Sequence, residues 1–147
     1  MQHIWSVLCQ KSIIDRESNL LSIIDCLEEI NFTTEKNIID SVVIPIEFQI
    51  INFWIIDNNL SSLTLKIDLL DPDKSIISNY ENSFAINKGA LRFRSITKIQ
   101  GITATKSGRY TFRISTKDNE KNVYNIMSEL PLDIKITTAK SLPIPSN

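Results

Sequence analysis

The stretch Leu63-Thr-Leu-Lys-Ile-Asp-Leu69 decides the fold class, because apolar and polar residues alternate along it without interruption. A period of two places one row of side chains in a core and the other row in water, as in a β-strand of a half-exposed sheet. This strand runs into Asp71-Pro-Asp-Lys74, where proline at the second position and the flanking aspartates are typical of a β-turn. Alternation followed by a turn predicts antiparallel β-structure.

The same pattern extends in both directions along the chain. Tyr110-Thr-Phe-Arg-Ile114 alternates directly after a turn at Lys106-Ser-Gly108, and further strands are expected near residues 91–99, 123–126 and 132–136. The long apolar stretch 42–56 contains two adjacent isoleucine pairs that break the alternation, which predicts either a bulge or burial on both faces. We therefore expect an all-β antiparallel β-sandwich, immunoglobulin-like or C2-like, with about seven to nine strands.

The segment Leu20–Ile30 has two interpretations. Its apolar residues recur at helical spacing and Ser18 or Asn19 could cap a helix, so that periodicity alone favours a helix. The isoleucines are β-branched, however, and the segment follows closely on a first strand in which Trp5, Val7 and Cys9 alternate with other residues.

The order and spacing of several short motifs resemble an uncharacterised family of small bacterial proteins, catalogued only as a domain of unknown function. The motifs are the opening Trp5-Ser-Val-Leu-Cys-Gln-Lys11 with the segment 19–30, the strand after Pro45, the turn Asp71-Pro-Asp73, and Ser107–Ile114. This resemblance implies a compact antiparallel sandwich and a strand, not a helix, at 20–30. It implies no activity, cofactor or catalytic residue.

The segment Ser107-Gly-x-Tyr110-x-Phe112 also resembles the tyrosine corner of immunoglobulin-like sandwiches, where a tyrosine at the start of a strand bonds back to a nearby backbone group. Phe112 stands where antibody domains carry a cysteine, so no disulfide between the sheets is expected. We interpret Tyr110 as a structural residue, because a buried tyrosine hydroxyl needs a hydrogen-bond partner.

Length and composition predict a single domain, residues 1–137, followed by an extended tail, residues 138–147, that contains two prolines. The formal net charge of −1 provides no global field that attracts nucleic acid or an anionic membrane. No stretch resembles a signal peptide or a membrane span, which predicts a cytoplasmic protein. In that compartment Cys9 and Cys26 are expected to be free thiols and small core side chains.

The residue inventory argues against the common catalytic and metal sites. His3 is the single histidine and is expected to be a solvated side chain near the N-terminus, so a Ser–His–Asp arrangement is not favoured. A calcium site or a small carboxylate-dependent hydrolase would have to use aspartates that fall at strand ends and turns, where aspartate serves its own backbone. These aspartates are Asp57, Asp68, Asp71, Asp73 and Asp118. The isolated glycines form no phosphate-binding loop. We therefore expect no cofactor, no metal and no enzyme.

Arginines on two late strands form the sharpest local feature. Arg92 and Arg94 share one strand face by the period of two, and Arg109 and Arg113 share a face on another strand. If both strands belong to one sheet, the four guanidinium groups form an anion-binding patch, because arginine binds carboxylate and phosphate through two parallel hydrogen bonds. The alternative is an ordinary solvated face that pairs with acidic residues on neighbouring strands. Both tryptophans, Trp5 and Trp54, are expected in the core.

The sequence thus favours a non-enzymatic binding or assembly module with a protein partner or a second copy of itself, and without a membrane partner. Binding of an anionic ligand through Arg92, Arg94, Arg109 and Arg113 is the alternative, with nucleic acid possible but not favoured. A carboxylate-dependent hydrolase is the third hypothesis.

Overall fold

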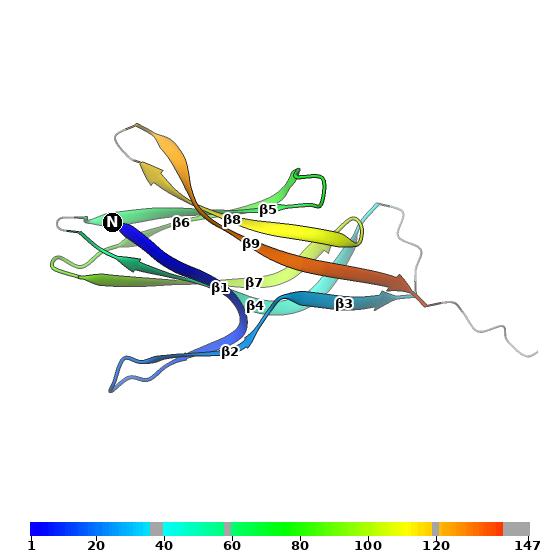
Figure 1. Ribbon diagram of the computed structural model, residues 1–147, viewed down its shortest axis with the longest axis horizontal. Helices are drawn as coiled ribbons and strands as arrows, with labels where there is room; N and C mark the ends of the chain where they lie inside the picture. The colour runs from blue at the N-terminus through cyan, green and yellow to red at the C-terminus, as the bar shows by residue number, and fades with distance from the viewer. Residues whose placement is uncertain (36–39, 58–59, 119–120, 140–147) are drawn as a thin grey trace, which may run out of the picture.

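The computed structural model describes residues 1–35, 40–57, 60–118 and 121–139. Within these ranges nine β-strands form two packed sheets and no helix occurs (Figure 1). The strands are β1 (Gln2–Ile14), β2 (Leu21–Cys26), β3 (Glu29–Thr34), β4 (Val42–Ile55), β5 (Ser62–Leu70), β6 (Ile76–Ala85), β7 (Arg92–Ala104), β8 (Gly108–Asp118) and β9 (Val123–Thr138). The predicted all-β sandwich is confirmed. The predicted tail, 138–147, lies outside the described residues from residue 140 onward.

The two sheets have different sizes and strand orders. Sheet A contains four strands in the order β2-β1-β4-β7, and sheet B contains five in the order β3-β9-β8-β5-β6. The neighbours pair antiparallel except for β3 and β9, which are parallel. The parallel pair arises because β3 leaves the edge of sheet A at the end of β2 and joins the edge of sheet B (Figure 1). β3 thereby links the two layers.

The hydrophobic core lies between the sheets and is built from the inward rows of the alternating strands. Trp54, Tyr110 and Phe112 are its largest fully buried side chains. Phe48 of sheet A meets Phe112 of sheet B edge to face, with ring centroids 5.7 Å apart. Such contacts between large buried side chains hold the layers together, since each aromatic side chain removes a large apolar area from water.

Tyr110 forms the predicted corner at the start of β8. Its hydroxyl donates to the carbonyl oxygen of Lys106 at 2.8 Å and accepts from the backbone N–H groups of Thr105 and Lys106 at 3.1 and 3.3 Å. The side chain itself is fully buried. The hydroxyl therefore fastens the β7–β8 turn to the core, which confirms the structural interpretation of this tyrosine.

The segment Leu20–Ile30 is extended and not helical. It forms β2, a two-residue connection and the start of β3. Asp15 closes the preceding turn by accepting hydrogen bonds from the backbone of Glu17 and Ser18, and Asn19 adopts a positive φ of 56°. The turn brings the chain back antiparallel to β1. The backbone N–H and C=O groups of the segment therefore bond to a neighbouring strand, whereas in a helix they would bond within the segment.

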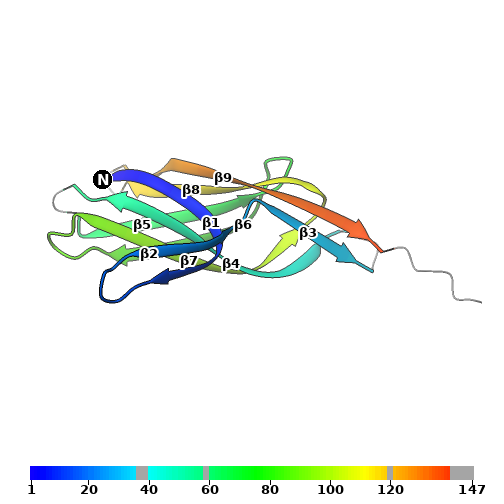
Figure 2. The same ribbon diagram turned by 60° about the horizontal axis from the view of Figure 1, so that its bottom comes forward.

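The β1–β2 hairpin leaves the plane of sheet A and lies over its outer face (Figures 1 and 2). Ser12 of the hairpin donates to Gln49 of β4 at 2.5 Å, and the backbone oxygen of Asn19 accepts from Arg94 of β7 at 2.8 Å. Ile51 therefore is fully buried although it points away from the core cluster to which Ile50 belongs.

For the adjacent isoleucines of β4, either a bulge or burial on both faces was predicted. At Ile50–Ile51 the strand is buried on both faces. The register shift of β4 against β7 lies instead between Ile44 and Glu47, beside Pro45, whose missing N–H interrupts the ladder. A single strand can therefore be apolar on both sides because one side faces sheet B and the other lies under the hairpin.

Candidate functional site

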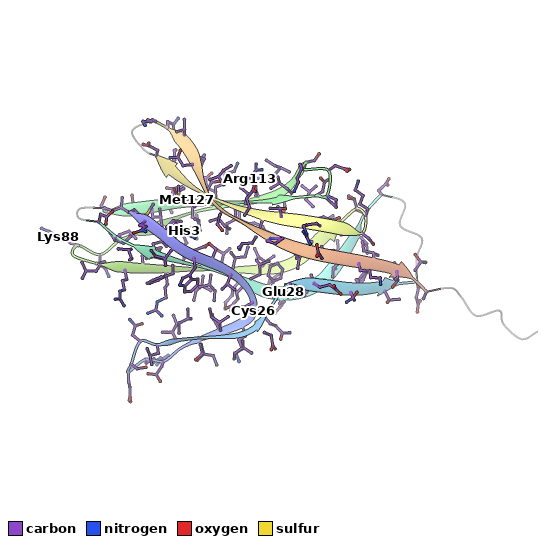
Figure 3. The ribbon with its side chains drawn as sticks, in the orientation of Figure 1. His3, Cys26, Glu28, Lys88, Arg113 and Met127 are labelled. Atoms are coloured by element: carbon purple, nitrogen blue, oxygen red, sulfur yellow. The ribbon has the colours of Figure 1, made fainter. Side chains whose placement is uncertain are left out.

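The four arginines named by the sequence divide between the two sheets. Arg92 and Arg94 lie on β7 in sheet A, whereas Arg109 and Arg113 lie on β8 in sheet B. Figure 3 shows Arg113 on the side of the sandwich away from Cys26 and the hairpin. The single four-arginine patch is therefore not formed, because its strands do not share a sheet.

Arg109 and Arg113 are paired with acidic residues directly across the β8–β9 ladder. Arg109 binds both carboxylate oxygens of Asp133 at 2.8 Å, and Arg113 binds Glu129 at 2.9 Å. The hydrogen bonds from Arg109 hold the pKa of the Asp133 carboxyl below its usual range. For these two residues the alternative of an ordinary solvated face is the correct one, and exposed pairs of this kind add little stability.

Arg92 and Arg94 have a different environment. Neither makes an ion pair with a carboxylate within the described residues. Arg94 donates through Nη2 to the carbonyl oxygen of Asn19, while its Nη1 is buried without a hydrogen-bond partner in this part of the chain. Because Nη1 is inaccessible, the charge that this pair presents to solvent is carried by the exposed Arg92 and by the rest of the half-buried Arg94 side chain.

A groove runs between this pair and the β1–β2 hairpin. It consists of two adjoining hollows of about 430 and 210 Å³. We call it the arginine groove; it is lined by Trp5, Ile14, Ser18, Asn19, Leu20, Leu21, Phe53, Arg92, Phe93 and Arg94. None of these lining residues is acidic. The groove thus combines an apolar floor with two cationic groups on one wall.

The aromatic part of the floor includes Trp5, whose predicted place in the core is wrong. Trp54 is fully buried between the sheets, but Trp5 is only half-buried and packs on Phe53 with ring centroids 5.5 Å apart. The cause is a register shift between His3 and Trp5, which leaves Ile4 as an extra residue in β1. From this bulge onward the row Trp5, Val7 and Cys9 faces outward, and the hairpin covers it.

His3 is also not the solvated terminal side chain that the sequence suggested. It is half-buried, its ring meets Trp54 with centroids 4.7 Å apart, and its Nε2 lies 2.7 Å from Oγ of Ser6. Ser6 donates to Oδ1 of Asn52 at 2.5 Å, and Nδ2 of Asn52 donates to Ser95 at 3.0 Å. Burial lowers the pKa of His3, and a backbone hydrogen bond with Trp5 partly opposes this.

The direction of these bonds does not fit activation of a nucleophile. Because Ser6 gives its proton to Asn52, His3 donates to the serine oxygen and does not accept its proton. A histidine that acts as general base has to accept the hydroxyl proton. The linked hydrogen bonds therefore give the polar side chains on the inner face of sheet A their partners, and the serine is not activated.

The aspartates considered for calcium or hydrolysis form no common site among the described residues. Asp71 and Asp73 share the turn after β5, whereas Asp68, wrongly expected at a strand end or turn, lies buried within β5 and pairs with Lys66 at 3.1 Å. Asp71 accepts from the backbone N–H groups of Asp73 and Ser75 at 2.9 and 2.8 Å, and Asp57 pairs with the N-terminal amino group at 2.7 Å. Asp57 precedes β5 and Asp71 follows it, so these two carboxylates lie at opposite ends of that strand. Among the described residues no group of three histidine, cysteine or acidic side chains is placed to hold a metal ion.

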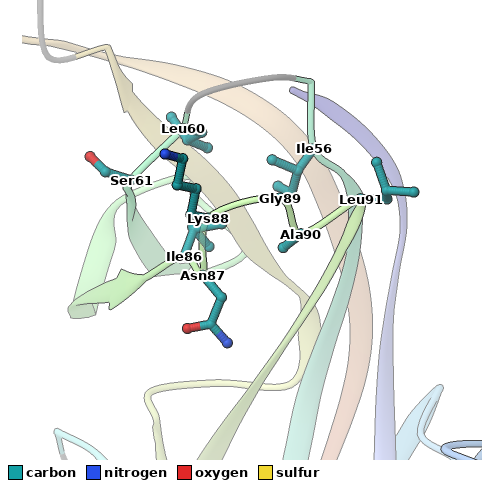
Figure 4. A pocket seen from close by; sticks show the side chains of 9 residues that line it. All are labelled: Ile56, Leu60, Ser61, Ile86, Asn87, Lys88, Gly89, Ala90 and Leu91. Atoms are coloured by element: carbon teal, nitrogen blue, oxygen red, sulfur yellow. The ribbon is translucent and has the colours of Figure 1, made fainter.

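A third hollow, of about 400 Å³, opens at one end of the sandwich (Figure 4). Its floor includes the buried residues Ile56 and Ile86, and Lys88 is the only ionisable side chain among its lining residues. It offers an apolar surface without an acid–base pair or a group of metal ligands. The arginine groove remains the site with both charge and shape.

The two cysteines have unlike environments. Cys9 is fully buried, as expected, but Cys26 is exposed because β2 is the edge strand of sheet A. Both are free thiols. The prediction that both serve as core side chains is therefore wrong for Cys26.

The fold and the groove define the class of the chain as an all-β sandwich with a cationic, partly apolar surface groove. A scan against protein-family models, a search of curated proteins and a search of solved structures each gave no match. The described residues include no helix with the length and apolar character needed to cross a bilayer.

Arg92 and Arg94 were predicted from the sequence as site residues, whereas Trp5, Phe53 and the hairpin tip were not predicted as parts of the same site. Leu20 carries a signal that could have been used, because it is a large apolar residue directly after a polar turn. In the structure its side chain is 69% exposed. The contact between residues 19 and 94 has no counterpart in local sequence, because it depends on the hairpin lying across β4 and β7.

Proposed function

We propose that this chain is a non-enzymatic protein-binding module, and that the arginine groove receives a segment of a partner protein with a carboxylate beside a large apolar side chain. The observation that carries the proposal is the contrast between the arginines. Arg109 and Arg113 have carboxylate partners within the chain, whereas Arg92 and Arg94 have none among the described residues. Arg92 is exposed and Arg94 is only half-buried, so both side chains can contact an acceptor supplied from outside.

The remaining walls of the groove favour a peptide over a nucleic acid. Trp5 and Phe53 provide an apolar floor, and Leu20 forms an exposed apolar rim. Nucleic-acid binding relies on many phosphate contacts, whereas the groove presents two guanidinium groups on a chain of net charge −1. One carboxylate and one apolar side chain match the groove in charge and size.

The proposal includes a cytoplasmic location. It also retains the resemblance to a bacterial family of unknown function, which adds no activity. A second copy of the chain as the partner is a possible outcome of the experiment below, because the groove is accessible from solvent.

The test is fluorescence anisotropy with labelled octapeptides that carry one Asp or Glu next to Leu or Phe, each compared with its Asn or Gln counterpart. We expect the acidic peptides to bind, and the double variant R92Q/R94Q to lose about tenfold or more in affinity, since a hydrogen bond to a charged group contributes about 1.5–3 kcal/mol. The matched control is R109Q/R113Q, which removes the same charge from the other sheet and is expected to bind like the wild type.

Equal binding of acidic and amide peptides, or equal weakening by both double variants, would contradict the proposal. A single-stranded oligonucleotide that binds with a steep salt dependence, and more tightly than every peptide, would replace it with the nucleic-acid alternative. Sedimentation of the unliganded chain identifies self-association through the groove if R92Q/R94Q abolishes it.

A further inference from the structure

The two cysteines of the chain meet at the base of the β1–β2 hairpin. Cys9 of β1 and Cys26 of β2 are directly opposite each other in the antiparallel register, although sixteen residues separate them in the sequence. Figure 3 shows Cys26 where the hairpin joins the body of the sandwich. Directly opposite residues of two strands project their side chains to the same face of the sheet.

The hydrogen-bond pattern defines the geometry of this pair more closely. The next pair along the ladder is hydrogen-bonded, because the backbone N–H of Leu27 donates to the carbonyl oxygen of Leu8 at 2.9 Å. Hydrogen-bonded and non-hydrogen-bonded pairs alternate in an antiparallel ladder, so Cys9 and Cys26 form a non-hydrogen-bonded pair, with Cα atoms typically about 4.5 Å apart. A disulfide accepts Cα separations of about 4.4–6.8 Å, so this register can accommodate the bond without a rearrangement of the strands.

The two thiols differ in their access to solvent. Cys26 is exposed on the edge strand, whereas Cys9 is fully buried. Burial raises the pKa of the Cys9 thiol, and the neighbouring Cys26 raises it further. An oxidant from solvent therefore meets Cys26 first, and Cys9 is held close to it as the second thiol.

We propose that Cys9 and Cys26 form an oxidation site that closes to a reversible cross-strand disulfide and locks the base of the β1–β2 hairpin. The oxidant is hydrogen peroxide. The Cys26 thiolate attacks one peroxide oxygen, the O–O bond breaks, and Cys26 becomes a sulfenic acid while the leaving oxygen takes a proton to form water. The sulfur of Cys9 then attacks the sulfur of Cys26, the S–S bond forms and the S–O bond breaks. The released hydroxide takes the Cys9 proton to form a second water.

The lock has a consequence for the part of the hairpin that lies over sheet A. The closed loop runs from Cys9 to Cys26 and contains Ser12 and Asn19, which bond to Gln49 and Arg94. A cross-link at the base restricts opening of this loop, since it removes chain entropy from the detached state. This inference concerns the chain's own thiols and does not depend on what the arginine groove binds.

The experiment treats the full-length chain with hydrogen peroxide, blocks remaining thiols with an alkylating agent, and digests it with trypsin without a reductant. Cleavage after Lys11, Arg16 and Lys36 separates the two cysteines, so the disulfide appears as peptide 1–11 joined to peptide 17–36. We expect this joined peptide, a monomeric chain, loss of both free thiols, and return of both thiols with dithiothreitol. Amide hydrogen exchange in residues 10–25 is expected to slow in the oxidised chain.

Two variants provide the controls. C26S removes an exposed thiol and is expected to fold normally and to leave Cys9 reduced after peroxide treatment. C9A removes the second thiol, so Cys26 is expected to proceed to sulfinic acid. Disulfide-linked dimers through Cys26, or sulfinic acid at Cys26 with Cys9 still free in the wild-type chain, would overturn the proposal. If C9A fails to fold, the wild-type digest and C26S alone still decide between these outcomes.

Discussion

Replacing Tyr110 by phenylalanine removes one oxygen atom and leaves the ring in the core. That oxygen makes three hydrogen bonds, one donated to Lys106 at 2.8 Å and two accepted from Thr105 and Lys106 at 3.1 and 3.3 Å. A net value of about 1 kcal/mol for the short bond and about half of that for each longer bond gives about 2 kcal/mol. Thr105 and Lys106 are exposed, so water can replace part of the hydrogen bonding that their backbone groups lose. The cost of leaving a buried polar group unpaired is therefore not added to the sum of about 2 kcal/mol.

The assay is urea unfolding followed by circular dichroism, with a thermal melt as a second measurement. We expect Y110F to lower the free energy of unfolding by about 2 kcal/mol at an unchanged slope, with a fall in Tm of about 6–8 °C for a domain of this size. Y80F is the matched control, because Tyr80 is exposed on β6. A loss within about 0.5 kcal/mol of that control would refute the view that the hydroxyl fastens the β7–β8 turn.

Two further predictions concern the backbone at the same corner and the titration of the N-terminal strand. G108A is expected to cost about 1–3 kcal/mol in urea unfolding, because Gly108 has a φ of 150° and an added Cβ would lie 2.8 Å from Cγ of Pro72; wild-type stability in this variant would show that the turn relaxes freely. Burial lowers the pKa of His3 below the value of about 6.5 in the unfolded chain, so the unfolded state binds the proton more readily. Stability is therefore expected to fall as the pH drops from about 6.5 toward the lowered pKa of the folded state, and H3Q, measured in parallel, should flatten that part of the profile; an unchanged slope would assign it to another group.

For the arginines, the sequence pattern predicts which side chains share a strand face but not which strands share a sheet. The period of two correctly placed Arg92 with Arg94 and Arg109 with Arg113 on shared strand faces, because side-chain alternation is a local property of extended backbone. It could not decide whether β7 and β8 belong to one sheet, since they are joined by a short turn yet lie in different layers. Which strands lie side by side depends on the packing of the entire core. That arrangement placed a carboxylate opposite Arg109 and Arg113 but not opposite Arg92 and Arg94.

The sequence by itself determined the all-β class, the turns at Asp71–Lys74 and Lys106–Gly108, and the structural use of Tyr110. These features depend on alternation, proline and aspartate in turns, and one buried hydroxyl, all of which act over a few residues. Only the tertiary structure decided that the segment after Asn19 forms strands, that Trp5 faces outward after a bulge, and that Cys9 lies opposite Cys26. Each of these depends on the register between paired strands, where a shift of one residue exchanges the buried and exposed faces. The groove and the cysteine pair exist because the β1–β2 hairpin lies across sheet A, an arrangement selected by packing and not by local pattern.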